Sequence, residues 1–398
     1  MYNLIQWRKY RYLIYIVVMV VAIFLQWYTH GVELFLTDDS YHYLAARDSF
    51  VETGQFMDDN GRYFLFWPPL FPIVLSLLAN PMAGASLLFM ALTVGIGILL
   101  FLIVDTVFNS RLIALICFAY IMLDVHLLCN SSFLWSEIGF TFLLMGFIYC
   151  LMYYGKSLTW EVLISLSGFL MCMQRNAGAF IIAGAFIWMV YRDMTNKRPI
   201  IKSIWVSAMA LSGLVLWNVY VWIFRSHTHF NFEDQWFQFA FENTTSLAQA
   251  LVRLFVPIPY ASVILVLLMA VVVAGIIFKM RSVSHAVWML MAICCSYLLC
   301  VWLVLLVNIA GFPVDFGEAD RFISVIAPVL IIIVFQAMEC ISMLMKDRFR
   351  KLFVAVLIFW VMYPLARSVK FAMQWHGRDD LKRTALTIDV ASNDALGS

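Results

Sequence analysis

The stretch around which this chain is organised is Thr37-Asp38-Asp39-Ser40-Tyr41-His42-Tyr43-Leu44-Ala45-Ala46-Arg47. It follows the first apolar run, Tyr12 to Tyr28, and leads to a Trp67-Pro68-Pro69-Leu70 turn. Ionisable side chains are scarce in this sequence, yet several of them stand together here, beside a segment long enough to enter a bilayer. We therefore expect chemistry at this point of the chain.

The composition indicates the class of protein. Of 398 residues, 64% are hydrophobic and 13% are charged, whereas a soluble domain carries about 25% charged residues. Apolar runs of about 20 residues, the length that crosses a bilayer core, recur along the whole chain. The net charge of +2 comes from basic residues in short loops, where they determine topology rather than bind nucleic acid. We expect an all-α, polytopic membrane protein in contact with membrane lipid.

The apolar runs predict about 11 transmembrane helices in one domain, residues 1–371, followed by a short polar tail, residues 372–398. Basic residues before the first run place the N-terminus in the cytoplasm. The first outer loop is then 29–66, and the second large outer loop is 225–260. The expected spans are 12–28, 85–108, 112–128, 136–154, 160–174, 177–191, 204–224, an eighth that ends at Lys279, 286–307, a tenth that begins at Arg321, and 352–371.

One group of basic residues contradicts this topology. The short inner loops carry lysine or arginine and the outer loops hold nearly all the acids, as the positive-inside rule requires. The end of the last span and the tail are the exception, because this topology places their basic residues outside. An error of one span late in the chain would remove the exception. These residues are Arg367, Lys370, Arg378, Lys382 and Arg383.

The first outer loop contains a predicted amphipathic helix, Asp39 to Thr53. Apolar residues recur at helical spacing from Tyr43 to Phe50. Thr37 or Asp38 can cap the N-terminus of this helix, and Gly54 can end it. We expect the helix to lie along the outer membrane surface.

Two adjacent carboxylates, Asp38 and Asp39, stand at the N-terminus of this predicted helix. Each of them is open to a structural interpretation as an N-cap, which the helix dipole and the unpaired amide groups favour. Only one of the two can be the cap, and we assign that role to Asp38. Asp39 is then the candidate for a catalytic base.

Three more ionisable residues stand at the outer ends of apolar spans. A carboxylate near the membrane, such as Glu137, costs on the order of a few kcal/mol unless it is paired or faces a wet cavity. Arg175 and Arg321 either extend to lipid phosphates or hold a phosphate inside the bundle. With Asp39 they would form a site whose acidic half comes from the first loop and whose basic half comes from distant spans.

Two polar residues near the outer end of the third span, Asp124 and His126, either line the same cavity or pair with a neighbouring span. The sequence does not specify a cofactor. A divalent metal is compatible with the predicted chemistry, but we assign no metal ligands.

The motifs of the first outer loop resemble those of the GT-C glycosyltransferases. The stretch Asp38 to Arg47, the segment Glu52-Thr53-Gly54-Gln55-Phe56 and the motif Pro68-Pro69-Leu70 are similar to the first outer loop of protein O-mannosyltransferases and bacterial lipid A aminoarabinose transferases. In that family an acidic pair opens the loop, a helix ends in a glycine turn, and a Pro-Pro-Leu motif leads into a short helix.

The resemblance continues in later spans and so covers most of the chain. Ser136-Glu137 resembles the acidic start of the family's fourth span, and Gln174 to Gly178 resembles its basic turn between spans five and six. Asp320-Arg321-Phe322, with Pro328, resembles its late Arg-Tyr-Pro span. One departure is the acidic pair, which is Asp-Asp here and often Asp-Glu in the family. This departure leaves open which of the two carboxylates is catalytic.

Members of this family take a sugar from a polyprenyl-phosphate carrier and transfer it, with inversion, to an acceptor at the outer or lumenal face. The resemblance implies a polyprenyl-phosphate sugar donor and a glycan, lipid or protein acceptor. It further implies that Asp39 or Asp38 is the base, that Arg175 and Arg321 bind the departing phosphate, and that Glu137 holds acceptor or sugar or orients an arginine. The predicted site residues are Asp39 and Asp38 as catalytic residues and Glu137, Arg175, Arg321, Tyr43 and Arg47 as substrate-binding residues.

Two other functions are compatible with a polytopic protein of this kind. A transporter or flippase of a lipid-linked sugar would be expected to show repeated halves and ionisable groups near the bilayer midplane, and this sequence shows neither pattern. A catalytically idle relative that serves as a scaffold is the other alternative. We therefore expect a glycosyltransferase in the bacterial inner membrane, with its active site on the outer face.

Overall fold

The computed structural model describes residues 2–224, 239–256, 285–307 and 316–378. In these ranges the chain is helical, and isolated β-bridges are its only extended pairings. The all-α prediction is therefore confirmed. The helices are α1 (Tyr2–His30), α2 (Asp38–Thr53), α3 (Leu70–Ser76), α4 (Pro81–Val107), α5 (Arg111–Met122), α6 (Val125–Ser132), α7 (Glu137–Leu151), α8 (Leu158–Gln174), α9 (Gly178–Thr195), α10 (Ile201–Phe224), α11 (Ala240–Arg253), α13 (His285–Val307), α14 (Phe316–Leu344), α15 (Asp347–Trp360) and α16 (Met362–Trp375).

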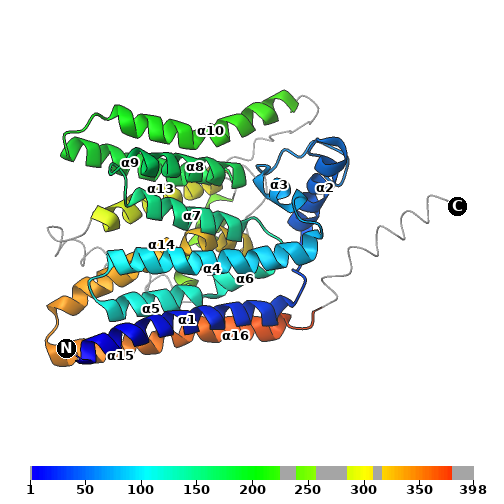
Figure 1. Ribbon diagram of the computed structural model, residues 1–398. Coiled ribbons are helices and arrows are strands. Elements are labelled where there is room, and N and C mark those ends of the chain that lie inside the picture. Colours follow the sequence, from blue (N-terminus) through cyan, green and yellow to red (C-terminus); the bar gives the residue numbers. More distant parts are fainter. Residues whose placement is uncertain (1, 225–238, 257–284, 308–315, 379–398) are drawn as a thin grey trace.

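The long helices lie side by side in a bundle (Figure 1). Within the described ranges, seven helical segments are long and apolar enough to cross a membrane, and α7 and α8 are shorter apolar helices. A helix satisfies its own backbone N–H and C=O groups, which hydrocarbon cannot do. The protein is thus an all-α polytopic membrane protein, as predicted. The count of 11 spans is not confirmed, and the predicted eighth span lies outside the described residues.

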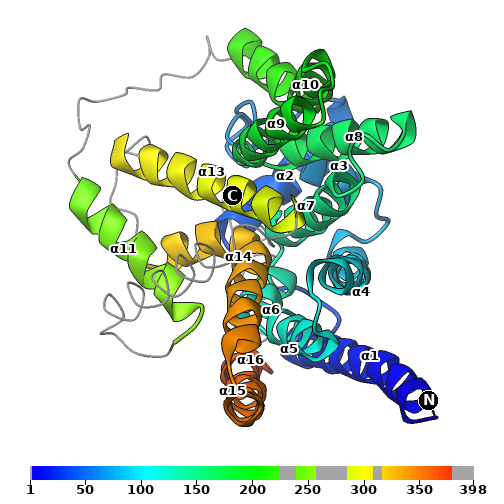
Figure 2. The ribbon, with the colours of Figure 1, turned by 90° about the vertical axis from the view of Figure 1, so that its left-hand side faces the viewer.

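The bundle has two distinct ends. Helices α2 and α3 lie together at one end, which we call the site end, and the N-terminus of α1 lies at the other (Figure 1). The second end carries the turns that precede α5, α10 and α15. Basic residues lie in or beside these turns, among them Arg111, Arg198 and Lys346, and we call this end the basic end. Figure 2 shows α14 in the middle of the bundle, where it packs against α5, α6, α7, α11 and α13.

The end of α16 returns to the site end. The ring nitrogen Nδ1 of His376 lies 2.7 Å from the backbone oxygen of Tyr28, and the two rings stack with their centroids 4.1 Å apart. The last helix therefore ends beside the start of the first loop.

The first-loop helix forms as predicted, with one correction at its N-terminus. Thr37, not Asp38, is the N-cap, and its backbone N–H donates to Ser40 Oγ at 3.0 Å. Asp38 is instead the exposed first residue of the helix. The prediction of Asp38 as the cap is therefore wrong, because the Thr37 and Ser40 side chains already form a capping box. Gly54, with a φ of 74°, ends the helix in the left-handed conformation that glycine favours.

Two predicted spans are each divided into two helices by a single polar or proline residue. The third span breaks after α5. Asp124 caps the next helix, α6, because its Oδ2 accepts a hydrogen bond from the backbone N–H of His126 at 3.2 Å. Residues 129–132, expected in an outer loop, are therefore helical. The last span is divided at Val361, because Pro364 has no N–H to donate to the carbonyl of Trp360.

The second outer loop holds a helix, α11, which we did not predict. Its buried Leu247 and Ala250 belong to the main hydrophobic core, and it packs against α13 and α14. The rest of this loop, apart from residues 239–256, lies outside the described residues. The last residue of α11, Arg253, lines the same cavity as Arg321, the predicted site residue of α14.

Candidate functional site

Glu137 is the centre of an ion-pair network at the site end. It begins α7 and is completely buried. Its Oε1 lies 2.7 Å from Arg175 Nη1 and 2.7 Å from Arg321 Nη2, and it accepts a further hydrogen bond from Arg321 Nε at 3.0 Å. A buried carboxylate is tolerated when cations and hydrogen bonds compensate its lost hydration. Of the roles expected for Glu137, which were to hold the acceptor or the sugar or to orient an arginine, this geometry corresponds to the orientation of arginines.

Arg321 joins three separate elements of the fold. Its Nη2 also lies 2.7 Å from Asp39 Oδ2, so one guanidinium bridges α14, α7 and α2. Its Cζ is 4.2 Å from the ring centroid of Trp135, which is the geometry of a cation–π contact. The stacked ring and two carboxylates fix the orientation of the guanidinium, while 27% of its side chain stays exposed.

Arg175 and Tyr43 meet at a hydroxyl group. Arg175 follows the last residue of α8, and its Nη1 donates to Ser136 Oγ at 3.3 Å. The Tyr43 hydroxyl donates to the same Oγ at 3.2 Å. Burial by itself would lower the pKa of Arg175. The attraction of the Glu137 carboxylate raises the pKa by more, so that the pKa lies above its ordinary value. Burial also raises the pKa of Tyr43, which keeps its hydroxyl protonated as a donor.

The structure brings together five of the seven predicted site residues. They are Asp39, Glu137, Arg175, Arg321 and Tyr43. Asp38 is exposed on the first turn of α2, and Arg321 contacts Asp39 instead. Arg47 pairs with Asp48 and donates from Nη2 to the backbone oxygen of Leu78 at 3.3 Å. The structure thus places neither Asp38 nor Arg47 in the ion-pair network.

A cavity of about 460 Å³ opens on one side of this network. Three arginines line it, Arg253 at the end of α11, Arg321 on α14 and Arg367 on α16. Nη1 of Arg367 donates to the backbone oxygen of Arg253 at 2.7 Å. Helices distant in sequence therefore supply cations to one cavity, and Trp135 forms part of its wall.

The same cavity is bordered by a buried histidine between two carboxylates. His126 Nδ1 lies 2.7 Å from Asp124 Oδ2, and its Nε2 lies 3.0 Å from Asp320 Oδ1. Both sequence interpretations of Asp124 and His126 thus hold in part, because His126 lines the cavity and also pairs with α14. The contact fixes the first turns of α14, and with them Arg321, against α6.

Three residues of this region were not predicted as site residues. Trp135 gave no signal in the sequence, and Arg253 was concealed in a loop whose helix we did not expect. Arg367 did give a signal, because it contradicted the positive-inside pattern. Of the basic residues that contradict this pattern, Arg367 lines the cavity, whereas Lys370 is exposed and does not.

Replacing Tyr43 with phenylalanine tests the role of Tyr43 as a support for Ser136. We expect a loss of about 1 kcal/mol in the free energy of unfolding, the usual value of a hydrogen bond, because the substitution removes only the bond to Ser136 Oγ. The side chain is only 1% exposed, so direct contact with a substrate is not expected. Thermal unfolding of the purified protein measures the change. A weaker donor affinity without any change in stability would contradict a supporting role.

This arrangement is an all-α membrane bundle with a carboxylate-bearing helix in the first loop, and solved structures of two other membrane proteins are similar to it. The structure is similar to ArnT from Cupriavidus metallidurans bound to undecaprenyl phosphate, with a TM-score of 0.60, 12% identity, and coverage of 95% of this chain and 79% of that chain. The apo state of the same protein gives a TM-score of 0.58 with the same identity and coverage.

A second similar structure is archaeal. The oligosaccharyltransferase AglB from Archaeoglobus fulgidus, in complex with an inhibitory peptide and a dolichol-phosphate, gives a TM-score of 0.53 and 12% identity, over 91% of this chain and 56% of that chain. No family model and no curated protein matches the sequence. The fold predicted from the first-loop motifs is thus confirmed by structures of very low sequence identity.

Proposed function

We propose that this protein is an integral membrane glycosyltransferase that moves a sugar from a polyprenyl-phosphate carrier to an acceptor. The observation that carries the proposal is the contact between Asp39 and Arg321, 2.7 Å apart, at the edge of a cavity lined by arginines. A carboxylate that can take a proton lies there beside cations that can hold a phosphate. The ligand-bound similar structures, one with undecaprenyl phosphate and one with a dolichol-phosphate, support this class of donor.

The reaction is a displacement at the anomeric carbon. The acceptor hydroxyl attacks this carbon from the face opposite the phosphate, and the bond between carbon and phosphate oxygen breaks with inversion. Asp39 takes the proton of the acceptor, and the polyprenyl phosphate leaves with the bonding electron pair. Arg321 stabilises the charge that develops on the leaving oxygen. Arg175 acts through Glu137, which it holds at 2.7 Å.

Arg253 and Arg367 are proposed to bind the phosphate of the carrier. Both line the cavity beside Arg321, and guanidinium groups match the geometry of phosphate oxygens. We propose that the site end lies on the outer face of the membrane, because the basic residues at the opposite, N-terminal end favour a cytoplasmic position by the positive-inside rule. In a bacterial inner membrane the site would then face away from the cytoplasm. Donor and acceptor would reach it from that side.

Reconstitution tests this function directly. The purified protein is placed in proteoliposomes with radiolabelled polyprenyl-phosphate sugars and a membrane extract that supplies glycan, lipid and protein acceptors. We expect label to move from the carrier to an acceptor, with inverted configuration in the product. Label that crosses between leaflets but never leaves its carrier would instead identify a flippase, and would overturn the proposal.

Replacing Arg367 with glutamine tests the phosphate site. We expect the KM for the donor to rise about tenfold or more, the value of one charged hydrogen bond, because the cavity loses one of its three arginines. Transfer rates measured over a range of donor concentrations give this value. Lys370→Gln is the matched control, since Lys370 lies one turn further on the same helix, is exposed and carries the same charge. Equal changes in the two variants would contradict a phosphate site at Arg367.

A further inference from the structure

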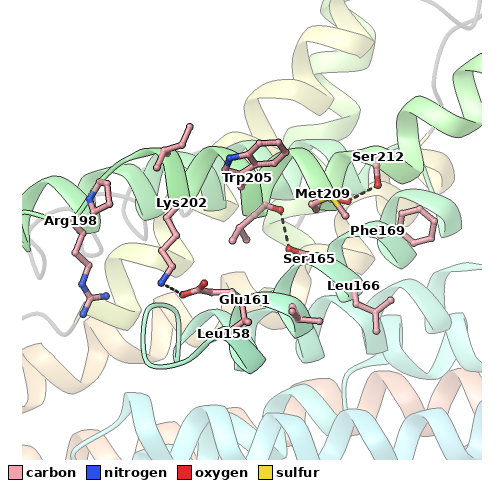
Figure 3. A pocket seen from close by; sticks show the side chains of 14 residues that line it. Leu158, Glu161, Ser165, Leu166, Phe169, Arg198, Lys202, Trp205, Met209 and Ser212 are labelled. Atoms are coloured by element: carbon pink, nitrogen blue, oxygen red, sulfur yellow. Dashed lines mark hydrogen bonds and ion pairs between the residues drawn. The ribbon is translucent and has the colours of Figure 1, made fainter.

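A second, larger cavity lies on the outside of the bundle, along α8 and α10 (Figure 3). It is a groove of about 860 Å³ whose lining is mostly apolar. No residue of the ion-pair network at the site end lines it. Exposed apolar side chains line it on both helices, and they are Leu158, Val162 and Leu166 of α8 and Trp205 and Met209 of α10.

The two helices approach each other closely near one end of the groove. A Cβ atom added at Gly168 would lie 2.6 Å from the Cβ of Ala210, and one added at Gly213 would lie 2.6 Å from the carbonyl oxygen of Phe169. Small residues of this kind bring membrane helices into contact. Ser165 Oγ also donates to the carbonyl of Val206 at 3.3 Å (Figure 3). The groove is therefore a fixed feature of the packing of α8 against α10.

The other end of the groove is positively charged. Arg198 and Lys202 line it there (Figure 3), and both α8 and α10 begin at this end, so that two helix N-termini add their positive dipoles. Lys202 Nζ lies 2.6 Å from Oε1 of the buried Glu161, which neutralises that lysine. Arg198 donates from Nη1 to the backbone oxygen of Gly155 at 3.2 Å, a contact with no opposite charge.

The dimensions match one leaflet of a bilayer. The lining residues of α8 extend from Leu158 to Phe169, about 16 Å at the rise of an α-helix, and half of a bilayer core is about 15 Å. We propose that this groove binds an anionic glycerophospholipid of the leaflet at the basic end. One acyl chain lies along α8 and α10, and the phosphate meets Arg198 and the two helix N-termini.

Native mass spectrometry of the full-length protein tests the headgroup. The protein is released from nanodiscs that contain equal amounts of phosphatidylglycerol and phosphatidylcholine, and the retained lipid is measured. We expect phosphatidylglycerol to be retained preferentially, and Arg198→Gln to weaken this retention about fivefold, the effect of one cation near an anionic surface. Arg348→Gln is the matched control, because Arg348 is an exposed arginine of α15 at the same end. Equal retention by the two variants would overturn the proposal.

Photo-crosslinking in native membranes tests the acyl chain. A benzoylphenylalanine at position 166, in the groove, is compared with one at position 216, an exposed leucine of α10 that does not line the groove. We expect an adduct with phospholipid at position 166 that is several times more abundant than the adduct at position 216. Equal lipid adducts at both positions, or a protein adduct at position 166 that indicates a partner helix in the groove, would overturn the proposal.

Discussion

Replacing Asp39 with asparagine is expected to slow sugar transfer by about 10²- to 10⁴-fold, the contribution of a positioned general base. The amide of asparagine cannot take the proton of the acceptor hydroxyl. Its oxygen can still accept the hydrogen bond that Arg321 Nη2 donates to Asp39 Oδ2 at 2.7 Å. The loss should therefore appear in kcat, with a much smaller change in the KM for the donor. Initial rates in proteoliposomes measure both constants.

Asp38→Asn is the matched comparison for this prediction. Asp38 is the neighbouring residue and the substitution removes the same charge, but this side chain is exposed and Arg321 contacts Asp39 instead. We expect Asp38→Asn to slow transfer far less than Asp39→Asn. The reverse order would assign the base to Asp38, and full transfer by both variants would remove the acidic pair from the mechanism.

Replacing Glu137 with glutamine is expected to lower the free energy of unfolding by about 3–5 kcal/mol, the cost of removing one partner from a buried ion pair. Glu137 is completely buried, and its Oε1 lies 2.7 Å from two guanidinium groups. Glutamine has the same shape but no charge, so that the buried Arg175 would lose its carboxylate partner and Arg321 would keep only Asp39. Thermal unfolding in detergent measures the change, and transfer should also fall because Arg321 loses one of the three groups that orient it.

Glu161→Gln is the control for the stability of a buried carboxylate. Glu161 is also buried, but its partner is a single lysine, Lys202, whose side chain is 41% exposed. Water can solvate this lysine after the substitution, so we expect a smaller loss of stability. Similar losses in the two variants would show that burial alone, rather than the paired arginines, determines the effect at Glu137.

The positions of the helices follow closely from the sequence, because an apolar run in a bilayer has few alternatives to a helix. The first-loop helix ends at Gly54 as predicted, since glycine adopts the left-handed conformation required there. The errors lie where one polar or cyclic side chain acts inside an apolar run. Asp124 begins a new helix in the third span, and Pro364 divides the last one. Hydropathy averaged over a window does not register such single residues.

The candidate site was predictable for a related reason. An ionisable side chain at the edge of a membrane needs a partner or a function, so the sequence alone was enough to select Asp39, Glu137, Arg175 and Arg321. Arg47 was selected through the resemblance of the first-loop motif instead, and the structure directs it to Asp48. Ionisable character identifies candidates, and it does not indicate where a side chain points.

The sequence by itself determined the class of protein, the helical segments and the candidate ionisable residues, because hydropathy and charge are local properties. Only the tertiary structure decided which of these residues meet. Arg321 contacts Glu137 and Asp39 across 184 and 282 residues of chain, and Arg367, one of the five exceptions to the charge rule, lines the cavity beside it. Such contacts depend on how helices pack in three dimensions, and no spacing along the chain encodes them.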